Sequence, residues 1–191
     1  MINLLVPRNL EGRKEKLKQM NIKLLSQEVI DGNLKLDESF MDIDPKFVKL
    51  KKINGDLELT GGQWTEIPEW LKNVEITGEF DCSYNQLTTL KNCPHNIGNS
   101  LLCYNNQLLS LEGCPKNIEG NFSCSYNKLT SLKNCPQKIG RGFYCSHNKL
   151  ISLYRCPEFI GGDLYCTNNK IKLELPDYVK IGCKLKSEFK N

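Results

Sequence analysis

The stretch Phe122-Ser-Cys-Ser-Tyr-Asn-Lys-Leu-Thr-Ser-Leu-Lys-Asn-Cys-Pro-Gln-Lys-Ile-Gly-Arg-Gly142 is one copy of a 21-residue unit that recurs along the chain. Two copies precede it, at residues 80–100 and 101–121, and one follows at 143–163. A degenerate copy begins at residue 164. Each copy opens [FL]-x-C-x-x-N-x-[LI], and the full copies continue x-x-L-x-x-C-P-x-x-I. A fixed period this short predicts a solenoid, in which each turn buries its apolar edge against its neighbours.

A second pattern, Ile-x-Gly-x-[LF]-x-[LC], extends the repeat toward the N-terminus. It begins at seven isoleucines and predicts seven strands: Ile30, Ile53, Ile76, Ile97, Ile118, Ile139 and Ile160. The first two intervals are 23 residues and the later ones 21, so the early turns are irregular, as solenoid ends usually are. We therefore expect an N-terminal cap at 1–29, a solenoid at 30–180, and a C-terminal strand with a charged tail at 181–191. Within the solenoid, the turns are irregular up to about residue 79 and regular over residues 80–163, and a degenerate turn begins at residue 164.

The positions within one copy have separate physical roles. Phe80 and Cys82 alternate with polar residues, which is the period of a strand with one buried face. An asparagine recurs where the chain leaves the strand, and its amide can satisfy backbone groups in a sharp bend. This column comprises Asn85, Asn106, Asn127, Asn148 and Asn169. The Cys-Pro pair excludes a helix on the outer side, so that side should be extended.

The unit resembles the leucine-rich repeat, whose hallmark is L-x-L-x-x-N-x-L, with Cys at the second leucine position and a Cys-Pro corner. Over roughly residues 30–180 the chain resembles the short repeats of bacterial effector proteins, and also cysteine-bearing repeats of large bacteriophages and giant viruses. The resemblance implies a mainly β fold, a right-handed parallel coil with a single curved sheet of seven or eight short strands. It also implies an extended convex side. A short N-terminal helix should cap the coil.

We interpret the cysteines as small buried hydrophobic residues. Nine of the ten fall at the two inward repeat positions, and Cys183 follows them. Zinc is the alternative, but the chain has no paired C-x-x-C, so we expect neither metal nor cofactor. Reduced thiols favour the cytoplasm, or the host cytoplasm for a viral protein. The start of the chain does not resemble a signal peptide and no span is apolar enough for a membrane.

A short basic helix is predicted near the N-terminus, at residues 13–20. Leu17 and Met20 are spaced three apart and should face inward, so the helix caps the first turn. The alternative is a phosphate-binding arm built from the lysines and arginines of this segment, but Glu11 and Glu15 are interleaved among them.

Outward positions of the predicted sheet suggest where a partner binds. Acidic side chains gather in the early turns, at Asp56, Glu58, Glu79 and Asp81. Aromatic and apolar ones gather in the later turns, at Leu102, Tyr104, Tyr144 and Tyr165, and the column at the strand exit adds Tyr84, Tyr126 and His147. Exposed tyrosines on a rigid sheet are typical of interaction hot spots, although tyrosine also simply suits exposed strand positions.

No catalytic constellation is evident. His95 and His147 occupy non-equivalent repeat positions, and the inward cysteines have no patterned histidine partner. We therefore expect a non-enzymatic module that binds another protein through the concave face of the sheet, as an inhibitor of a host defence protein if the origin is viral. One alternative is nucleic-acid binding through the basic helix and a ladder of Lys128, Lys149 and Lys170, which the acidic turns oppose. The other alternative is a structural homo-oligomer.

Overall fold

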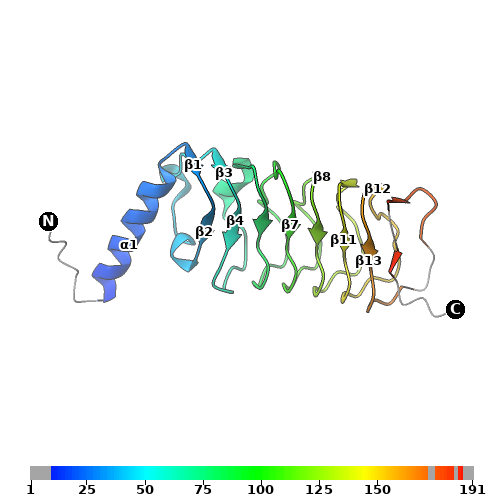
Figure 1. Cartoon of the computed structure of the whole chain (residues 1–191). Coiled ribbons are helices and arrows are strands. Elements are labelled where there is room, and N and C mark those ends of the chain that lie inside the picture. The colour runs from blue at the N-terminus through cyan, green and yellow to red at the C-terminus, as the bar shows by residue number, and fades with distance from the viewer. Residues whose placement is uncertain (1–9, 172–174, 183–184, 187–191) are drawn as a thin grey trace.

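The chain folds into a parallel β-solenoid preceded by one α-helix (Figure 1). The computed structural model describes residues 10–171, 175–182 and 185–186. The predicted fold class is confirmed, because successive turns of about 21 residues stack with their strands in parallel register.

The largest sheet, which we call the front sheet, has eight parallel strands and takes one strand from each turn. Each phenylalanine or leucine that opens a repeat pairs with its equivalent in the next turn, as Phe122 does with Phe143. In chain order its strands are β2 (Leu34–Leu36), β4 (Leu57–Leu59), β6 (Phe80–Asp81), β7 (Leu101–Leu102), β9 (Phe122–Ser123), β11 (Phe143–Tyr144), β13 (Leu164–Tyr165) and β15 (Leu185–Lys186).

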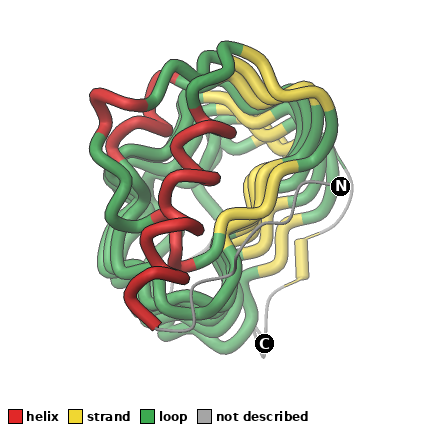
Figure 2. The backbone as a smooth tube through the Cα atoms, turned by 90° about the vertical axis from the view of Figure 1, so that its left-hand side faces the viewer, coloured by secondary structure: helices red, strands yellow, loops and turns green. Residues whose placement is uncertain are grey.

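A second set of parallel pairings, the side ladder, precedes each front strand around a corner (Figure 2). The sequence patterns combined these two strands into one. One part contains β1 (Val29–Asp31), β3 (Lys52–Asn54) and β5 (Glu75–Ile76), extended by a bridge from Ile76 to Ile97. The other contains β8 (Asn117–Ile118), β10 (Lys138–Ile139), β12 (Phe159–Ile160) and β14 (Lys180–Ile181). At the corner, a Cβ on Gly140 would lie 2.1 Å from the carbonyl oxygen of Glu119, so glycine permits the close approach of adjacent turns.

The asparagine column forms the predicted internal ladder. Asn127 accepts a hydrogen bond from the Leu108 backbone N–H at 2.9 Å and donates one to the Cys103 carbonyl at 3.0 Å, both in the preceding turn. Its amide also donates to the carbonyls of Cys124 and Ser125 in its own turn. The column repeats these bonds from Asn85 to Asn169, and so supplies partners to backbone groups that the bend leaves without any.

The outer side is extended, as the prolines predicted. Three short 3-10 helices occur only in the irregular turns: η1 (Glu38–Phe40), η2 (Pro45–Phe47) and η3 (Glu69–Asn73). Among the described residues after Asn73 there is no helix. In the four regular turns a hydroxyl caps the outer bend by accepting a hydrogen bond from the backbone N–H two residues later, as Ser152 does from Tyr154 at 2.8 Å.

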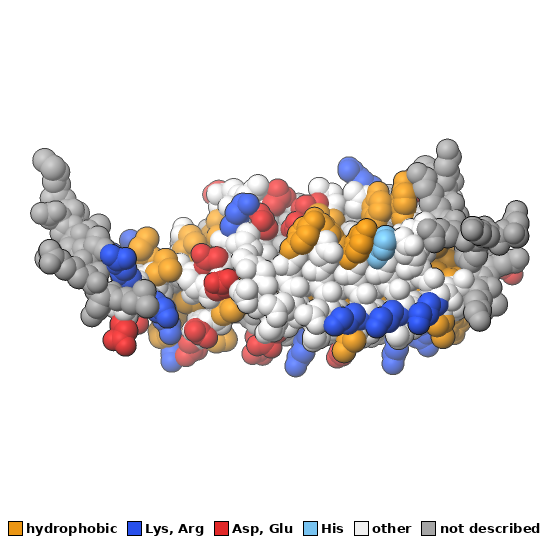
Figure 3. Space-filling model, turned by 90° about the horizontal axis from the view of Figure 1, so that it is seen from below, with side chains coloured by type: hydrophobic (Ala, Val, Ile, Leu, Met, Phe, Trp, Pro, Cys, Tyr) orange, Lys and Arg blue, Asp and Glu red, His pale blue; other side chains and the backbone are white. Residues whose placement is uncertain are grey.

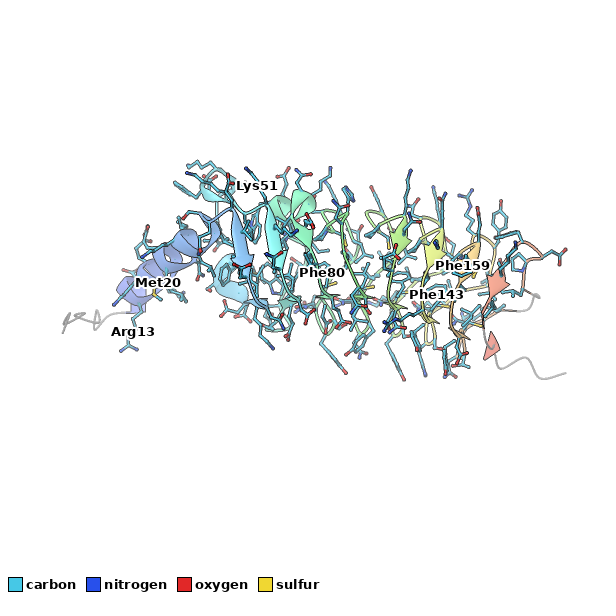
Figure 4. All side chains as sticks on the ribbon, turned by 45° about the horizontal axis from the view of Figure 1, so that its top comes forward. Arg13, Met20, Lys51, Phe80, Phe143 and Phe159 are labelled. Atoms are coloured by element: carbon cyan, nitrogen blue, oxygen red, sulfur yellow. The ribbon has the colours of Figure 1, made fainter. Side chains whose placement is uncertain are left out.

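The N-terminal helix α1 (Leu10–Leu25) is longer than predicted, and only its last part packs on the solenoid. Leu25 is fully buried, and Asn21 donates a hydrogen bond to the Ser39 hydroxyl at 2.8 Å. The expectation that Leu17 and Met20 face inward is wrong, since Met20 is 60 % exposed and Leu17 is also exposed. Figure 4 shows Met20 and Arg13 on the part of the helix that extends beyond the first turn, where there is no core to receive them.

Candidate protein-binding face

The outward side chains of the front sheet form one row across the strands. Register pairs join Lys35 to Glu58, Glu58 to Asp81, Asp81 to Leu102, Leu102 to Ser123, Ser123 to Tyr144, and Tyr144 to Tyr165. From Glu58 to Tyr165 these residues are half-buried, because each packs beside its neighbours while one side faces solvent. The row therefore runs from charged to aromatic along the solenoid, as predicted.

The aromatic end is packed into an ordered surface. The rings of Tyr144 and Tyr165 are stacked, with centroids 4.9 Å apart and planes 19° apart, and the Tyr165 hydroxyl donates to Asp163 at 3.3 Å. A Cβ on Gly142 would lie 2.8 Å from the Tyr144 ring, so this glycine leaves the space that the ring occupies. The two tyrosines thus present a flat apolar surface that is already held in place.

The column at the strand exit, which we call the exit column, has a left-handed backbone at every position. The values of φ lie between 51° and 55° for Tyr84, Asn105, Tyr126, His147 and Asn168. Asparagine tolerates this conformation readily, whereas a tyrosine there has a steric cost of about 1 kcal/mol. Tyr84 is nevertheless 64 % exposed and Tyr126 51 % exposed, so burial of their rings offsets little of that cost. Burial alone therefore does not explain why these two positions are aromatic.

One ring contact lies within the exit column, and another joins the column to Tyr104. Tyr126 stacks on His147 with centroids 4.0 Å apart, and the side-chain amide of Asn168 lies 2.9 Å from His147 Nε2. Tyr84 meets Tyr104 edge to face, with centroids 5.1 Å apart. Partial burial, and then the nearby Asp81 carboxylate, raise the pKa of Tyr104. Tyr104 therefore lies where the aromatic and acidic parts of the face meet.

At the acidic end, like charges lie side by side. Glu58 pairs in register with Asp81 on the next strand, and of these two only Glu58 has an ion-pair partner among the described residues, Lys35 at 2.5 Å. Burial raises the pKa of Glu79, a hydrogen bond from Ser100 opposes this shift, and the charges of Asp81 and Asp56 add to it. Placing Glu58 directly opposite Asp81 is unfavourable for folding, because like charges on adjacent strands repel.

Asp56, which the sequence patterns grouped with these acids, has a structural role instead. Its carboxylate accepts the backbone N–H of Glu79 at 2.8 Å, the equivalent position in the next turn. Asn33 accepts from Asp56, and Asn121 accepts from Gly142, in the same way. This corner ladder was missed because its members differ in residue type.

A basic row lies beside the exit column. Lys128, Lys149 and Lys170 are exposed at equivalent positions of successive turns. In Figure 3, blue side chains run along the solenoid parallel to a row of orange and pale-blue ones. Lys128 donates to Gln107 at 2.9 Å, so part of the row is engaged with its neighbours.

The cysteines line the core and carry no evident chemistry. The nine described cysteines are free thiols, seven of them buried, with Cys114 and Cys135 half-buried. Burial raises the pKa of Cys156 to about 12 and of Cys166 to about 11, so both stay protonated thiols at neutral pH. No group of three or more metal-ligating side chains occurs within the described part of the chain. Cys183 lies outside the described residues.

The sequence-predicted residues form one continuous face on the front sheet and its exit edge. Strand alternation also predicts that Ser125, one residue past inward-facing Cys124, faces solvent, and this prediction is wrong, since Ser125 is buried at 9 % exposure. A further hollow lies elsewhere, where the side ladder is interrupted between Ile97 and Ile118, and its lining includes Ile76, His95 and Pro115.

No protein-family description matches the sequence, and no curated protein is significantly similar to it. The described helix is too short and too polar to span a membrane.

Proposed function

We propose that this protein is a non-enzymatic binding module that engages another protein through the front sheet and the exit column. The observation that carries the proposal is the presence of Tyr84 and Tyr126 at left-handed positions where two other turns have asparagine. Their rings are exposed, and the ring contacts that they make within the face do no more than offset the cost of a left-handed tyrosine. Preorganised aromatic side chains lose little entropy when a partner covers them.

The face is large enough for this purpose. Eight strands spaced about 4.8 Å apart give a surface on the order of 34 Å long. A typical stable interface buries about 800 Å² on each partner, which a strip of this length and ordinary width can supply. The resemblance to effector and phage repeats leads us to propose further that the partner is a host protein that is inhibited on binding in a reducing compartment.

The decisive experiment places a photo-crosslinking phenylalanine analogue at position 126 and identifies the protein that it captures in the native host. Binding of the purified partner is then measured for the wild type, for Tyr84→Asn with Tyr126→Asn, and for Tyr144→Ser with Tyr165→Ser. We expect both pairs to lose at least tenfold in affinity, because truncating an aromatic anchor typically costs about 2 kcal/mol. The matched control replaces Lys116 and Lys138, exposed on the side ladder and its approach, with alanine. If the lysine pair weakens binding and the tyrosine pairs do not, the partner docks elsewhere.

Single-stranded nucleic acid is the second candidate, favoured by the lysine row beside the exit column. Aromatic side chains flanked by lysines are typical of such sites. Against it, Tyr126 and His147 are stacked 4.0 Å apart, which leaves no space for a base between them, and the acidic turns repel phosphate. Tight binding of oligouridine at low salt that is lost steeply as salt rises would favour this candidate over the first.

A self-associating module is the remaining candidate, and it makes a separate prediction. Sedimentation at rising protein concentration should show a dimer that Tyr126→Asn dissociates. A monomer at all concentrations would exclude it.

A further inference from the structure

The side ladder is interrupted between Ile97 and Ile118, and we call this gap the seam. At the same corner of four other turns, the residue after the isoleucine donates its backbone N–H to the isoleucine carbonyl of the preceding turn. Gly140 donates to Ile118 in this way at 2.8 Å, and Gly98, Gly161 and Gly182 make the equivalent bonds. Among the described residues, Glu119 makes no such bond to Ile97, and neither backbone group of Ile97 has a hydrogen-bond partner.

The cause of the seam is a side chain at a position where regular stacking requires glycine. A Cβ on Gly161 would lie 2.1 Å from the carbonyl oxygen of Gly140, the equivalent residue of the preceding turn. The same Cβ contact would be 2.1 or 2.2 Å at Gly98, Gly140 and Gly182. Because Glu119 carries a Cβ, its turn cannot stack this closely on Gly98, and the two turns separate at this corner.

The front sheet stays closed at the same level of the coil. Leu101 pairs in register with Phe122, and the Cys103 N–H donates to the Ser123 carbonyl at 2.8 Å. The two turns therefore keep the ordinary strand spacing on the front and are spread apart on the side, where the hollow opens. A stack that is spread on one side only is tilted there, so the turns before the seam are inclined relative to the turns after it.

The ring contacts of the binding face divide at the same level. The first block, before the seam, is Tyr84 with Tyr104, and the second block, after it, is Tyr126 with His147 and Tyr144 with Tyr165. Among the described residues, no ring contact joins the two blocks. Each block is thus packed within itself, and their relative orientation depends on how the turns stack at the seam.

We infer that Glu119 is a wedge that sets the angle between the two blocks, so that the partner protein contacts each block with a separate part of its surface. The inference rests on the proposed function and names how the same face is arranged for its partner. Glu119 is exposed at the end of β8, away from the front sheet. It is therefore a positioning residue, which acts through the stacking of the turns and not by contact with the partner.

The first experiment compares Glu119→Gly, which removes the wedge, with Glu119→Ala, which removes the carboxylate but keeps the Cβ. Amide hydrogen exchange is followed by NMR on the isotopically labelled full chain. In the wild type and in Glu119→Ala, the amide of residue 119 should be at least about tenfold less protected than that of Gly140. In Glu119→Gly it should reach the protection of Gly140. Equal protection of the two amides in the wild type, or no gain in Glu119→Gly, would overturn the wedge.

Residual dipolar couplings of the front-strand amides measure the angle between the turns before the seam and those after it. This angle should change in Glu119→Gly and not in Glu119→Ala. An angle that stays the same although residue 119 becomes protected would show that the seam does not orient the blocks, and would also overturn the inference.

The last experiment measures affinity for the purified partner that is captured through position 126. We expect Glu119→Gly to bind at least about threefold more weakly, because a change of angle spoils the fit of the two surfaces, and Glu119→Ala to bind as the wild type does. Unchanged affinity of Glu119→Gly would contradict a role of the angle in binding. An equal loss in Glu119→Ala would show that the carboxylate itself is recognised, and the wedge would be rejected.

Failure of the wedge is distinguishable from failure of the binding face, which Tyr84→Asn with Tyr126→Asn tests directly. If the tyrosine pair weakens binding and Glu119→Gly does not, the face stands and the wedge is wrong. If the tyrosine pair has no effect, the face is wrong, and the inference that rests on it is rejected with it.

Discussion

The imidazole of His147 lies parallel to the ring of Tyr126, with their centroids 4.0 Å apart and their planes within 9° of each other. Both residues hold a left-handed backbone, and they come from neighbouring turns of the solenoid. The spacing of turns in a parallel sheet is close to the separation of stacked rings, so a column of aromatic side chains packs against itself without distortion. This surface is thus set before any partner arrives.

Replacing Tyr126 with asparagine should leave folding almost unchanged. The variant loses the stacking on His147, which stabilises the fold by about 1 kcal/mol. It also removes a similar steric cost, because asparagine tolerates the left-handed backbone better than tyrosine does. We expect the free energy of unfolding to stay within about 1 kcal/mol of the wild type, measured by urea denaturation. A fall of several kcal/mol would show that the ring belongs to the fold and would remove the main reason for a binding role.

Asn127→Ala should be strongly destabilising. It leaves the Leu108 N–H without a partner inside the coil, at a cost of about 1–3 kcal/mol, and the Cys103 carbonyl keeps only Asn106 as a side-chain donor. The control is Asn117→Ala, the same change at an exposed side chain on β8. Ser125, at first sight a natural reference in the same turn, is unsuitable because it is buried. Equal midpoints for the two alanine variants would contradict the internal ladder.

The carboxyl of Glu79 should make stability depend on pH. Its pKa in the folded protein lies above the ordinary value of 4.5, so the folded state holds the proton more tightly than the unfolded chain. The contribution of Glu79 to the free energy of unfolding is therefore largest below pH 4.5. It is lost as the pH rises from 4.5 to the higher pKa of the folded state. Glu79→Gln should be more stable than the wild type at pH 7 and equal to it near pH 4. A variant that is less stable at pH 7 would contradict the sign of the shift.

The thiols should be inert in the native protein. Desolvation raises the pKa of Cys82, Cys124 and the other buried cysteines, and the thiolate is the reactive form. Under denaturation all 10 cysteines should react with a maleimide reagent, whereas the native protein should react slowly and at few sites. Cys114 and Cys135 are the most exposed of the described thiols, but burial also raises their pKa, so they too should react slowly. A disulfide or a stoichiometric metal in freshly purified protein would contradict this.

The repeat pattern was sufficient to predict the solenoid, the inward cysteines and the asparagine ladder, because each depends on one residue type recurring at one position. The left-handed backbone of the exit column was not predicted. It could have been, because asparagine tolerates a positive φ and occupies two positions of the column, Asn105 and Asn168. The corner ladder was not predicted, because Asn, Asp and Ser can each accept the hydrogen bond from the equivalent backbone N–H, so no single residue type recurs there. The prediction that Met20 faces inward was wrong because a spacing of three residues indicates a buried helix face only where a core packs against that face.

The direction of the asparagine bonds has a consequence for synthesis on the ribosome. Asn106 closes the bend that begins at Cys82, and Asn127 closes the one that begins at Cys103, so each turn is completed by a residue about 24 positions later in the chain. A nascent chain emerges N-terminus first, and its most recent turn therefore always lacks its polar closure. Folding should lag emergence of the chain by one full turn, and a chain that has emerged only as far as residue 126 would carry a frayed last coil on an otherwise ordered stack.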